Sequence, residues 1–381
     1  MTLKQELRVL PRTVPSRKSI RLGGFSLVYR PLAVSVSIAL AVALFLLLCI
    51  NIGRGDYPIS IPDVISVLLG NGSKTQNLIV FDLRLPRSLT ALFIGMALGI
   101  AGAVTQTIAR NALASPDILG ITAGSSAAAV ALIVLGGGGS FVGLLATLGI
   151  PLAALCGGLL TAVVIYALAW RKGVEGFRLI LIGIGINAML VAATGWLLIS
   201  ADINDASRAQ VWLNGSLNGA TWNQMWPVAI AVAVVGGYAV IASFTMGALR
   251  LGDDNATSLG VRLQSSQAKL LLSAVALAAI ATAAAGPVGF VALAAPQVAM
   301  RLVRSAGPPI VASALTGAVL VVGSDVIART ILPVELPVGI VTSALGGPFL
   351  LYLLVRNNRK VTALPPSPSP PMLLRVSSRR I

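Results

Sequence analysis

The candidate functional residues of this chain are the charged side chains that lie beside or inside its apolar runs. Arg84 and Arg87 flank Leu85-Pro86 immediately before a long apolar run. Two guanidinium groups held at a helix mouth could each bind a carboxylate of another protein through paired hydrogen bonds. Alternatively, they anchor the helix end at a membrane surface, as arginine often does there. The residue pattern slightly favours docking of a partner.

A second charged pair, Asp325 and Arg329, falls within an apolar run near the other end of the chain. A separation of four residues places both side chains on one face of a helix, so the spacing predicts a structural ion pair. A carboxylate inside a membrane is also a candidate for ion or proton coupling. The arginine one turn away favours the ion pair. No other acidic residue lies deep in an apolar run, which weighs against a relay of carboxylates.

The polar segment 249–267 separates two apolar runs and carries the signals of a short helix. Gly252 precedes Asp253 and Asp254, which can cap the start of a helix, and Gly260 can lie just beyond its end. These residues predict a helix of about two turns. It is either an ordinary surface helix or a projection that fits a groove on a partner, and residue types alone do not separate the two.

The apolar run at 88–109 is rich in small residues. Gly95, Gly99 and Gly102 could let a neighbouring helix approach closely, although such spacing is frequent in membrane helices. Asn111 follows this run. It could line a polar constriction, or it could cap the chain turn before Pro116.

Several kinds of chemistry are excluded by residues that the sequence lacks. The chain contains no histidine, so imidazole metal sites, Ser-His-Asp triads and imidazole proton relays are excluded. Its two cysteines, Cys49 and Cys156, lie in apolar runs and are typical of packing residues. No glycine-rich ATP-binding loop, CxxC or HExxH motif is present. The sequence therefore predicts a protein that is not an enzyme and binds no metal or cofactor directly.

The elements that must position these residues are membrane-spanning helices. Apolar residues make up 56% of the 381-residue chain and charged residues 10%, against roughly 45–50% and 25% in soluble domains. One span needs ~20 mostly apolar residues, so the apolar content is sufficient for about ten. Gly286-Pro287 leaves open a kinked helix or two spans joined by a tight turn. We predict an all-α polytopic membrane protein with spans at 31–52, 88–109, 118–137, 141–169, 177–200, 227–248, 268–286, 288–304, 308–331 and 337–355.

The net charge of +16 is concentrated in two tails, 1–30 and 357–381, which flank the predicted transmembrane domain at 31–356. Basic tails beside a span predict cytoplasmic retention and attraction to anionic membrane lipid, and not binding of nucleic acid. Ten spans place both termini in the cytoplasm and most of the 28 lysines and arginines on the inner side, as the positive-inside rule requires. The proline-rich C-terminal tail is predicted to be disordered.

Taken together, several segments resemble the permease subunits of ABC importers for iron chelates and cobalamin, the FecCD/BtuC-like family. Two of them, Phe177-Arg-Leu-Ile-Leu-Ile-Gly-Ile-Gly185 and Gly215-Ser-Leu-Asn-Gly-Ala-Thr-Trp222, look most like a ferric-enterobactin-type permease. Each segment alone is weak evidence for the family. The set of segments in this order is specific for it and extends from about 56 to 356. The other matching segments are Arg84-Leu-Pro-Arg-Ser-Leu89, Asn111-Ala-Leu-Ala-Ser-Pro-Asp-Ile-Leu-Gly120, Leu251-Gly-Asp-Asp254, Leu259-Gly-Val261, Gly286-Pro-Val-Gly-Phe290, Ala295-Pro296 and Glu335-Leu-Pro-Val-Gly339.

The resemblance implies a type II ABC importer permease in the bacterial cytoplasmic (inner) membrane, with ferric siderophore as the transported ligand. It implies a dimer with a second permease subunit, identical or paralogous, around the translocation path. Two ATPase subunits would bind ATP and Mg²⁺, and a soluble substrate-binding (lipo)protein would deliver the chelate. Two alternatives are a cobalamin or haem permease of the same family and, in a different class, an ion-coupled secondary transporter that needs no ATPase.

The resemblance also implies roles for individual residues. Arg329 has two implied roles, because it could dock a partner or pair only with Asp325. Gln297 departs from the family, which usually has histidine after Ala-Pro. The implied sets are docking of the binding protein by Arg84, Arg87 and Arg329, coupling to the ATPase by Gly252, Asp253, Asp254, Ala256, Leu259 and Gly260, and a gate formed by Asn111, Gly176 and Phe177.

Overall fold

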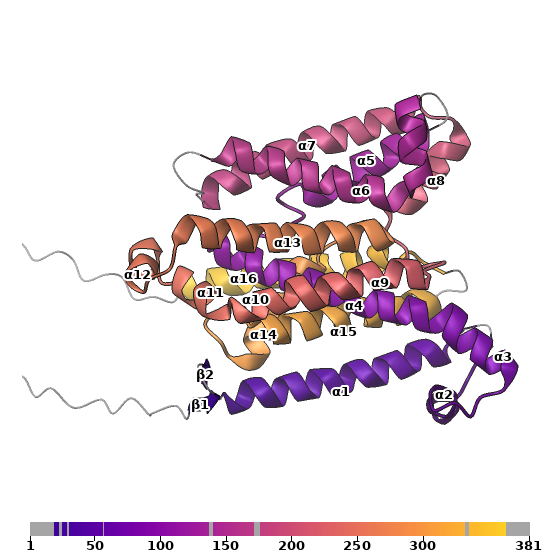
Figure 1. The fold of residues 1–381 in the computed structure, drawn as a ribbon, viewed down its shortest axis with the longest axis horizontal. Coiled ribbons are helices and arrows are strands. Elements are labelled where there is room, and N and C mark those ends of the chain that lie inside the picture. The colour runs from indigo at the N-terminus through magenta and orange to yellow at the C-terminus, as the bar shows by residue number, and fades with distance from the viewer. Residues whose placement is uncertain are drawn as a thin grey trace, which may run out of the picture.

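A computed structural model describes residues 19–22, 25–28, 30–55, 57–136, 140–170, 176–331 and 335–362, and helices dominate this part of the chain (Figure 1). Before the central helix come β1 (Ser19–Leu22), β2 (Phe25–Val28), α1 (Pro31–Gly53), α2 (Ile61–Leu68), α3 (Lys74–Asn77) and the π-helix η1 (Leu78–Arg84). The next elements are α4 (Leu85–Ile108), α5 (Ile121–Leu135), α6 (Ser140–Ala169), α7 (Gly176–Ser200), α8 (Ile203–Leu213) and α9 (Trp222–Ala231). The remaining elements are the π-helix η2 (Val232–Gly236), α10 (Gly237–Ile241), α11 (Ser243–Leu249), α12 (Asp253–Ser258), α13 (Leu263–Ala285), α14 (Val291–Val303), α15 (Ile310–Thr330) and α16 (Val338–Thr362).

The helices reproduce the order of the ten predicted spans. In the described residues, seven helical stretches are long and apolar enough to cross a membrane, and α5, α14 and the first part of α16 are shorter apolar helices. The interruption at Gly286-Pro287 separates two helices and does not kink one. Gly286 and Phe290 both have positive φ, at 73° and 64°, and these left-handed residues turn the chain between α13 and α14. The prediction of an all-α membrane fold is confirmed.

The bundle is built around α4. This helix packs most extensively against α15 and also against α13 and α14, while α1 covers the other side of α15. Helices α5, α6, α7 and α8 form a separate layer that meets the rest through α13 (Figure 1). Short elements mark the two ends of the bundle, with α12 at one and α2 and α3 at the other. We refer to these as the α12 end and the α2 end.

Three glycines on α4 allow its main chain to touch the main chain of its neighbours. A Cβ atom at Gly95 would lie 2.4 Å from the carbonyl oxygen of Gly317, and one at Gly99 would lie 2.2 Å from that of Ser313. At Gly102 a Cβ would lie 1.7 Å from the carbonyl oxygen of Ala292 on α14. The close approach predicted from these small residues is therefore present, and it brings α4 against both α15 and α14.

The segment 53–87 joins the first two predicted spans, 31–52 and 88–109, and was therefore expected to be a loop, but it is largely helical. Ser60 and Ser73 cap α2 and α3, and Ser73 forms a reciprocal capping box with Gln76. From Lys74 the chain stays helical to Ile108. The π-helix η1 comes immediately before Pro86, whose missing N–H and bulky ring disturb a regular α-helix. The second half of the predicted loop thus forms a helical extension of α4.

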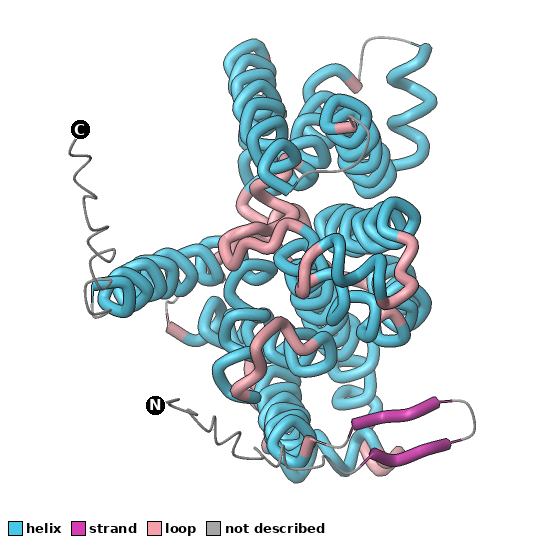
Figure 2. Tube along the Cα trace, turned by 90° about the vertical axis from the view of Figure 1, so that its left-hand side faces the viewer, coloured by secondary structure: helices cyan, strands magenta, loops and turns pink. Residues whose placement is uncertain are grey.

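The chain termini differ in part from the predicted tails. Strands β1 and β2 pair antiparallel, with Ser19 opposite Val28, inside the segment 1–30 that was expected to be a simple tail (Figure 2). Helix α16 runs past the predicted boundary at 356 to Thr362. The rest of both predicted tails lies outside the described residues, so the disorder predicted for the C-terminal tail stays a prediction.

Candidate functional site

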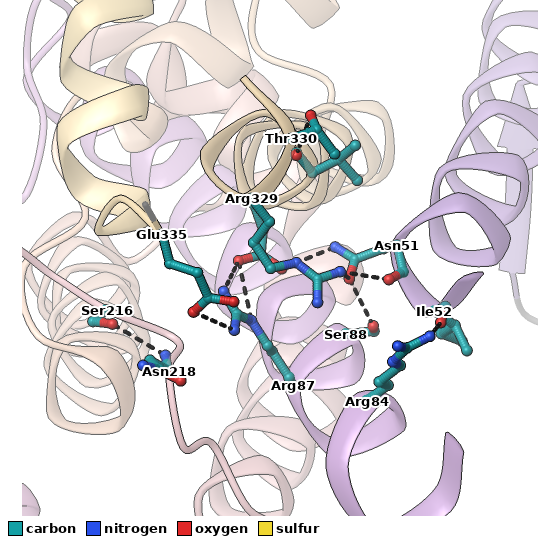
Figure 3. A network of polar contacts seen from close by, with 12 residues as sticks. Asn51, Ile52, Arg84, Arg87, Ser88, Ser216, Asn218, Arg329, Thr330 and Glu335 are labelled. Carbon is teal, nitrogen blue, oxygen red and sulfur yellow. Dashed lines mark hydrogen bonds and ion pairs between the residues drawn. The ribbon is translucent and has the colours of Figure 1, made fainter. Parts of the chain in front are cut away.

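The α2 end of the bundle contains a buried carboxylate, Asp325, beside Arg87 and Arg329, both of which are labelled in Figure 3. Asp325 on α15 is fully buried. Its Oδ1 atom accepts hydrogen bonds from Arg87 on α4, at 2.9 Å from Nη2 and 3.3 Å from Nε. Its Oδ2 atom accepts a hydrogen bond from the side-chain amide of Asn51 on α1 at 3.0 Å. These partners offset part of the large cost of removing a carboxylate from water.

Arg329 joins the same cluster from one turn further along α15. Its Nε lies 3.9 Å from Asp325 Oδ2, so the four-residue spacing does bring the two side chains together, although Arg87 is closer to the carboxylate. Arg329 Nη2 also donates to Asn51, both to the side-chain Oδ1 at 2.8 Å and to the main-chain oxygen. Ser88 donates to the same Oδ1 at 3.1 Å. Asn51 therefore connects α1, α4 and α15.

Arg84 and Arg87 point to different partners. Arg84 donates to the main-chain oxygens of Ile52, at 2.8 Å, and Tyr57, at 2.6 Å, so it stabilises the end of α1. Arg87 Nη1 lies 3.5 Å from Glu335, whose side chain is half exposed in the segment before α16. Both arginines are more than nine-tenths buried. Sequence analysis missed Asn51, Ser88 and Glu335, because nothing local links them to the arginines.

A polar cavity of about 790 Å³ opens beside this cluster. All three arginines predicted to dock a partner line it, together with further charged residues of both signs. The charges in its wall would suit an acidic group of a partner, and docking stays a prediction. The charged lining residues are Arg54, Asp82, Arg84, Arg87, Arg329 and Glu335.

At the α12 end, the segment 249–267 contains the short helix that its sequence predicts. Helix α12 lies between Gly252 and Gly260, whose φ values of 103° and 81° suit glycine. Ala256 is fully buried and holds the helix against the bundle. Asp254 and Leu259 are exposed, so α12 presents both a charged and an apolar side chain at this end of the protein.

The predicted gate residues lie near the end of α4. Asn111 Oδ1 accepts a hydrogen bond from the main-chain N–H of Leu113 at 2.9 Å, which matches the capping alternative. A Cβ at Gly176 would lie 3.0 Å from Ala109, so α7 begins in contact with the end of α4. Phe177 is 80% exposed. The three residues therefore gather at one end, and their role as a gate stays a prediction.

Gln297, which departs from the family pattern, belongs to a buried amide pair. Its Nε2 donates to Gln106 Oε1 at 2.7 Å, and Gln106 Nε2 donates to the main-chain oxygen of Leu293 at 3.1 Å. Both glutamines are 4% exposed. An amide both donates and accepts, so Gln106 can accept from Gln297 and at the same time donate to the main chain of α14. Sequence analysis missed Gln106, because the two residues are far apart in the chain.

The amide pair gives a first prediction. Gln297→Leu should lower the free energy of unfolding by about 1–3 kcal/mol, because Gln106 would keep a buried oxygen without a donor. The double variant Gln106→Leu/Gln297→Leu should recover part of that loss, since neither amide remains. Thermal melting of the purified variants in detergent measures the loss in the single variant and the recovery in the double variant. Equal melting temperatures for the single and double variants would show that the amide pair is not the cause.

A second cavity, of about 690 Å³, lies in the wall formed by α5, α7, α14 and α16. Its size suits a small ligand. Its lining is mostly apolar but includes Asp117, which is half buried in the loop between α4 and α5 and accepts a hydrogen bond from the Thr122 hydroxyl. Desolvation raises the pKa of the Asp117 carboxyl, while the Thr122 hydrogen bond lowers it. The other polar lining residues are Ser115, Ser126, Asn187 and Thr194.

In the part of the chain that the structure describes, seven long apolar helical stretches and three shorter ones define a polytopic membrane protein. Among the described residues, no group of three or more His, Cys, Asp or Glu side chains could hold a metal ion. The chain belongs to the FecCD transport family, whose sequence profile matches residues 43–356. It is thus a permease, the membrane channel subunit of an ABC transporter, and ATP is hydrolysed by a separate subunit.

Named relatives place the chain within this family. It is 40% identical over 308 residues to the ferric enterobactin transport system permease protein FepG of Escherichia coli (strain K12), covering 80% of this chain and 91% of the relative. It is 42% identical to the achromobactin transport system permease protein CbrC of Dickeya dadantii (strain 3937), covering 81% and 87%. A solved metal-chelate type ABC transporter in an inward-facing conformation matches with a TM-score of 0.73 and 25% identity, covering 84% and 99%. The resemblance to iron-chelate permeases is confirmed.

Proposed function

We propose that this chain is a permease subunit of an ATP-driven, binding-protein-dependent importer for ferric siderophores. The observation that supports this cargo is the family match over residues 43–356, together with relatives named for enterobactin, achromobactin and iron(3+)-hydroxamate. These relatives have similar identities to the chain, at 40%, 42% and 38%. The proposal therefore extends to siderophores as a class and not to one of them.

The partners follow from the family and from the two ends of the bundle. A second permease subunit would complete the translocation path, of which the 690 Å³ cavity would form part of the wall. Two ATPase subunits would bind at the α12 end, where exposed Asp254 and Leu259 are available for contact. A soluble binding protein would dock at the α2 end through Arg84, Arg87 and Arg329, which line the charged cavity there.

This assignment of partners fixes the orientation. The α12 end faces the cytoplasm and the α2 end faces outward in the bacterial inner membrane. An even number of spans then places both termini in the cytoplasm, where their basic residues satisfy the positive-inside rule. Charged groups at a docking surface set the orientation and rate of association more than its affinity.

Reconstitution tests the proposed function. We expect radiolabelled ferric siderophore to enter proteoliposomes only when this chain, its second permease, the ATPase subunits, the binding protein and ATP are all present. Omitting the ATPase subunits alone is the matched control. If the chain without these partners instead accumulates the chelate when an ion gradient is imposed, it is a secondary transporter and the proposal is wrong.

A further inference from the structure

Arg110 connects the end of α4 to both sides of the Gly252 turn. Its Nε donates to the main-chain oxygen of Leu249, the last residue of α11, at 3.0 Å. Its Nη2 forms an ion pair with Asp253, the first residue of α12. Arg110 itself has a φ of 48°, in a left-handed region that non-glycine residues rarely adopt. A strained main chain thus aims one guanidinium at the two residues that flank the start of α12.

Arg250 makes a second connection from the same turn. Its Nη2 donates to the main-chain oxygen of Ala306, in the loop between α14 and α15. The guanidinium lies directly against Gly307, because a Cβ at that position would overlap it. The segment before α12 is therefore attached to the chain that leads into α15, while Arg110 attaches α12 to α4.

Arg110 follows α4 and Arg250 bonds to the loop that leads into α15, and these two helices also carry the charged cluster at the α2 end. Arg87 on α4 and Asp325 on α15 form its shortest ion pair. Between the two ends, Gly95 and Gly99 bring the main chains of α4 and α15 into contact. The 24 residues of α4 extend over about 36 Å. A single closely packed helix pair thus joins the proposed docking end to the proposed coupling helix.

We propose that Arg110 is a positioning residue that transmits movement between α4 and the coupling helix α12 through its ion pair with Asp253. This inference rests on the proposed function, because it assumes that α12 contacts an ATPase subunit. The ion pair holds α12 in register with α4, so a displacement of α4 by the docked binding protein displaces α12 as well. Without the pair, α12 would follow that movement less directly, through its buried Ala256, its neighbours α11 and α13 and the Arg250 contact before it.

A purely structural surface pair would behave differently. The side chains of Arg110 and Asp253 are 42% and 53% exposed, and pairs this exposed contribute little to folding stability. Loss of the ion pair should therefore leave folding unchanged. If loss of the pair lowers the stimulation of ATP hydrolysis by the binding protein while the protein stays folded, the pair has a positioning role and not a merely stabilising one.

A charge exchange in the complete reconstituted complex tests the inference. Arg110→Asp and Asp253→Arg should each reduce binding-protein stimulation of ATPase activity and uptake by roughly tenfold, within the usual range of coupling between sites. Basal ATPase activity and complex assembly should not change with Arg110→Asp, because Arg110 lies outside the set of residues that is implied to contact the ATPase. The double exchange Arg110→Asp/Asp253→Arg should restore most of the stimulation. The matched control is the same exchange at Arg208 and Asp205, an exposed pair at 3.6 Å on α8, which should change nothing.

Two results would overturn the inference. Single variants that assemble and remain fully stimulated would show that the pair transmits nothing, and a double exchange as inactive as the single variants would show that charge pairing is not the cause. In both cases the wild-type complex would still transport, so the proposed function would stand. A wild-type chain that assembles with no ATPase subunit would instead overturn the proposed function.

Discussion

Replacement of Asp325 by asparagine is expected to lower the free energy of unfolding by about 3–5 kcal/mol, the usual cost of removing one partner from a buried ion pair. The variant keeps the shape of the side chain but removes its charge. Arg87 and Arg329 would then remain mostly buried beside a neutral amide, with Glu335 at 3.5 Å from Arg87 as the nearby carboxylate. A lower melting temperature in detergent and a reduced yield of assembled complex would measure the effect.

Glu335→Gln provides the matched control for this prediction. Its side chain is half exposed and its contact with Arg87 is longer, so its loss should cost no more than about 1 kcal/mol. A lower melting temperature for Asp325→Asn than for Glu335→Gln would show that the stabilising charge is that of Asp325. Equal melting temperatures for Asp325→Asn, Glu335→Gln and the wild type would contradict a stabilising role for the cluster.

Gly102→Val is the second substitution with a large expected effect. Even the Cβ of the new side chain would lie 1.7 Å from the carbonyl oxygen of Ala292, and a main-chain atom inside a helix cannot rotate away. Helices α4 and α14 would have to separate, which breaks the packing on both sides of the contact. Overpacking of a core typically costs about 1–3 kcal/mol, and a main-chain clash is expected at or above the upper limit. Thermal melting and gel-filtration profiles in detergent measure the loss.

Gly237→Ala is the control for the glycine prediction. Gly237 is also helical, but no atom lies within 4 Å of a Cβ at its position. Alanine favours a helix over glycine by about 1 kcal/mol, so this variant should be as stable as the wild type or slightly more stable. If Gly102→Val melts at the wild-type temperature, the close approach of α4 and α14 does not limit stability.

The sequence was sufficient to predict the spans and the short helix α12, because these depend on local patterns. Apolar runs give the positions of the spans, and glycines with neighbouring aspartates mark the helix between them. The segment 53–87 was harder, because its polar residues resemble a loop until Ser60 and Ser73 are seen to cap helices. Arg84 was singled out as a docking residue, which stays a prediction, and its contacts with Ile52 and Tyr57 were not foreseen.

The composition of the polar clusters could not be predicted from local patterns. Asp325 was paired with Arg329 from spacing, whereas its shortest ion pair is with Arg87, a residue 238 positions away in the chain. Gln297 had no explanation until Gln106 was placed beside it, across 191 positions. A single sequence carries no signal for such contacts, because they arise only when the helices pack. The structure therefore adds the partners of residues that sequence analysis had already found unusual.

The glycine contacts along α4 also limit how this chain can change shape. Where Gly95 and Gly99 meet α15, backbone touches backbone, and no side chain lies between them that could change its rotamer. The two helices must therefore travel as one rigid body, since close-packed interiors hardly compress. The layer α5 to α8 meets this body mainly through α13, so any opening of a passage falls along that seam. A displacement of α4 therefore carries α15 with it, whereas the layer α5 to α8 can shift relative to both helices.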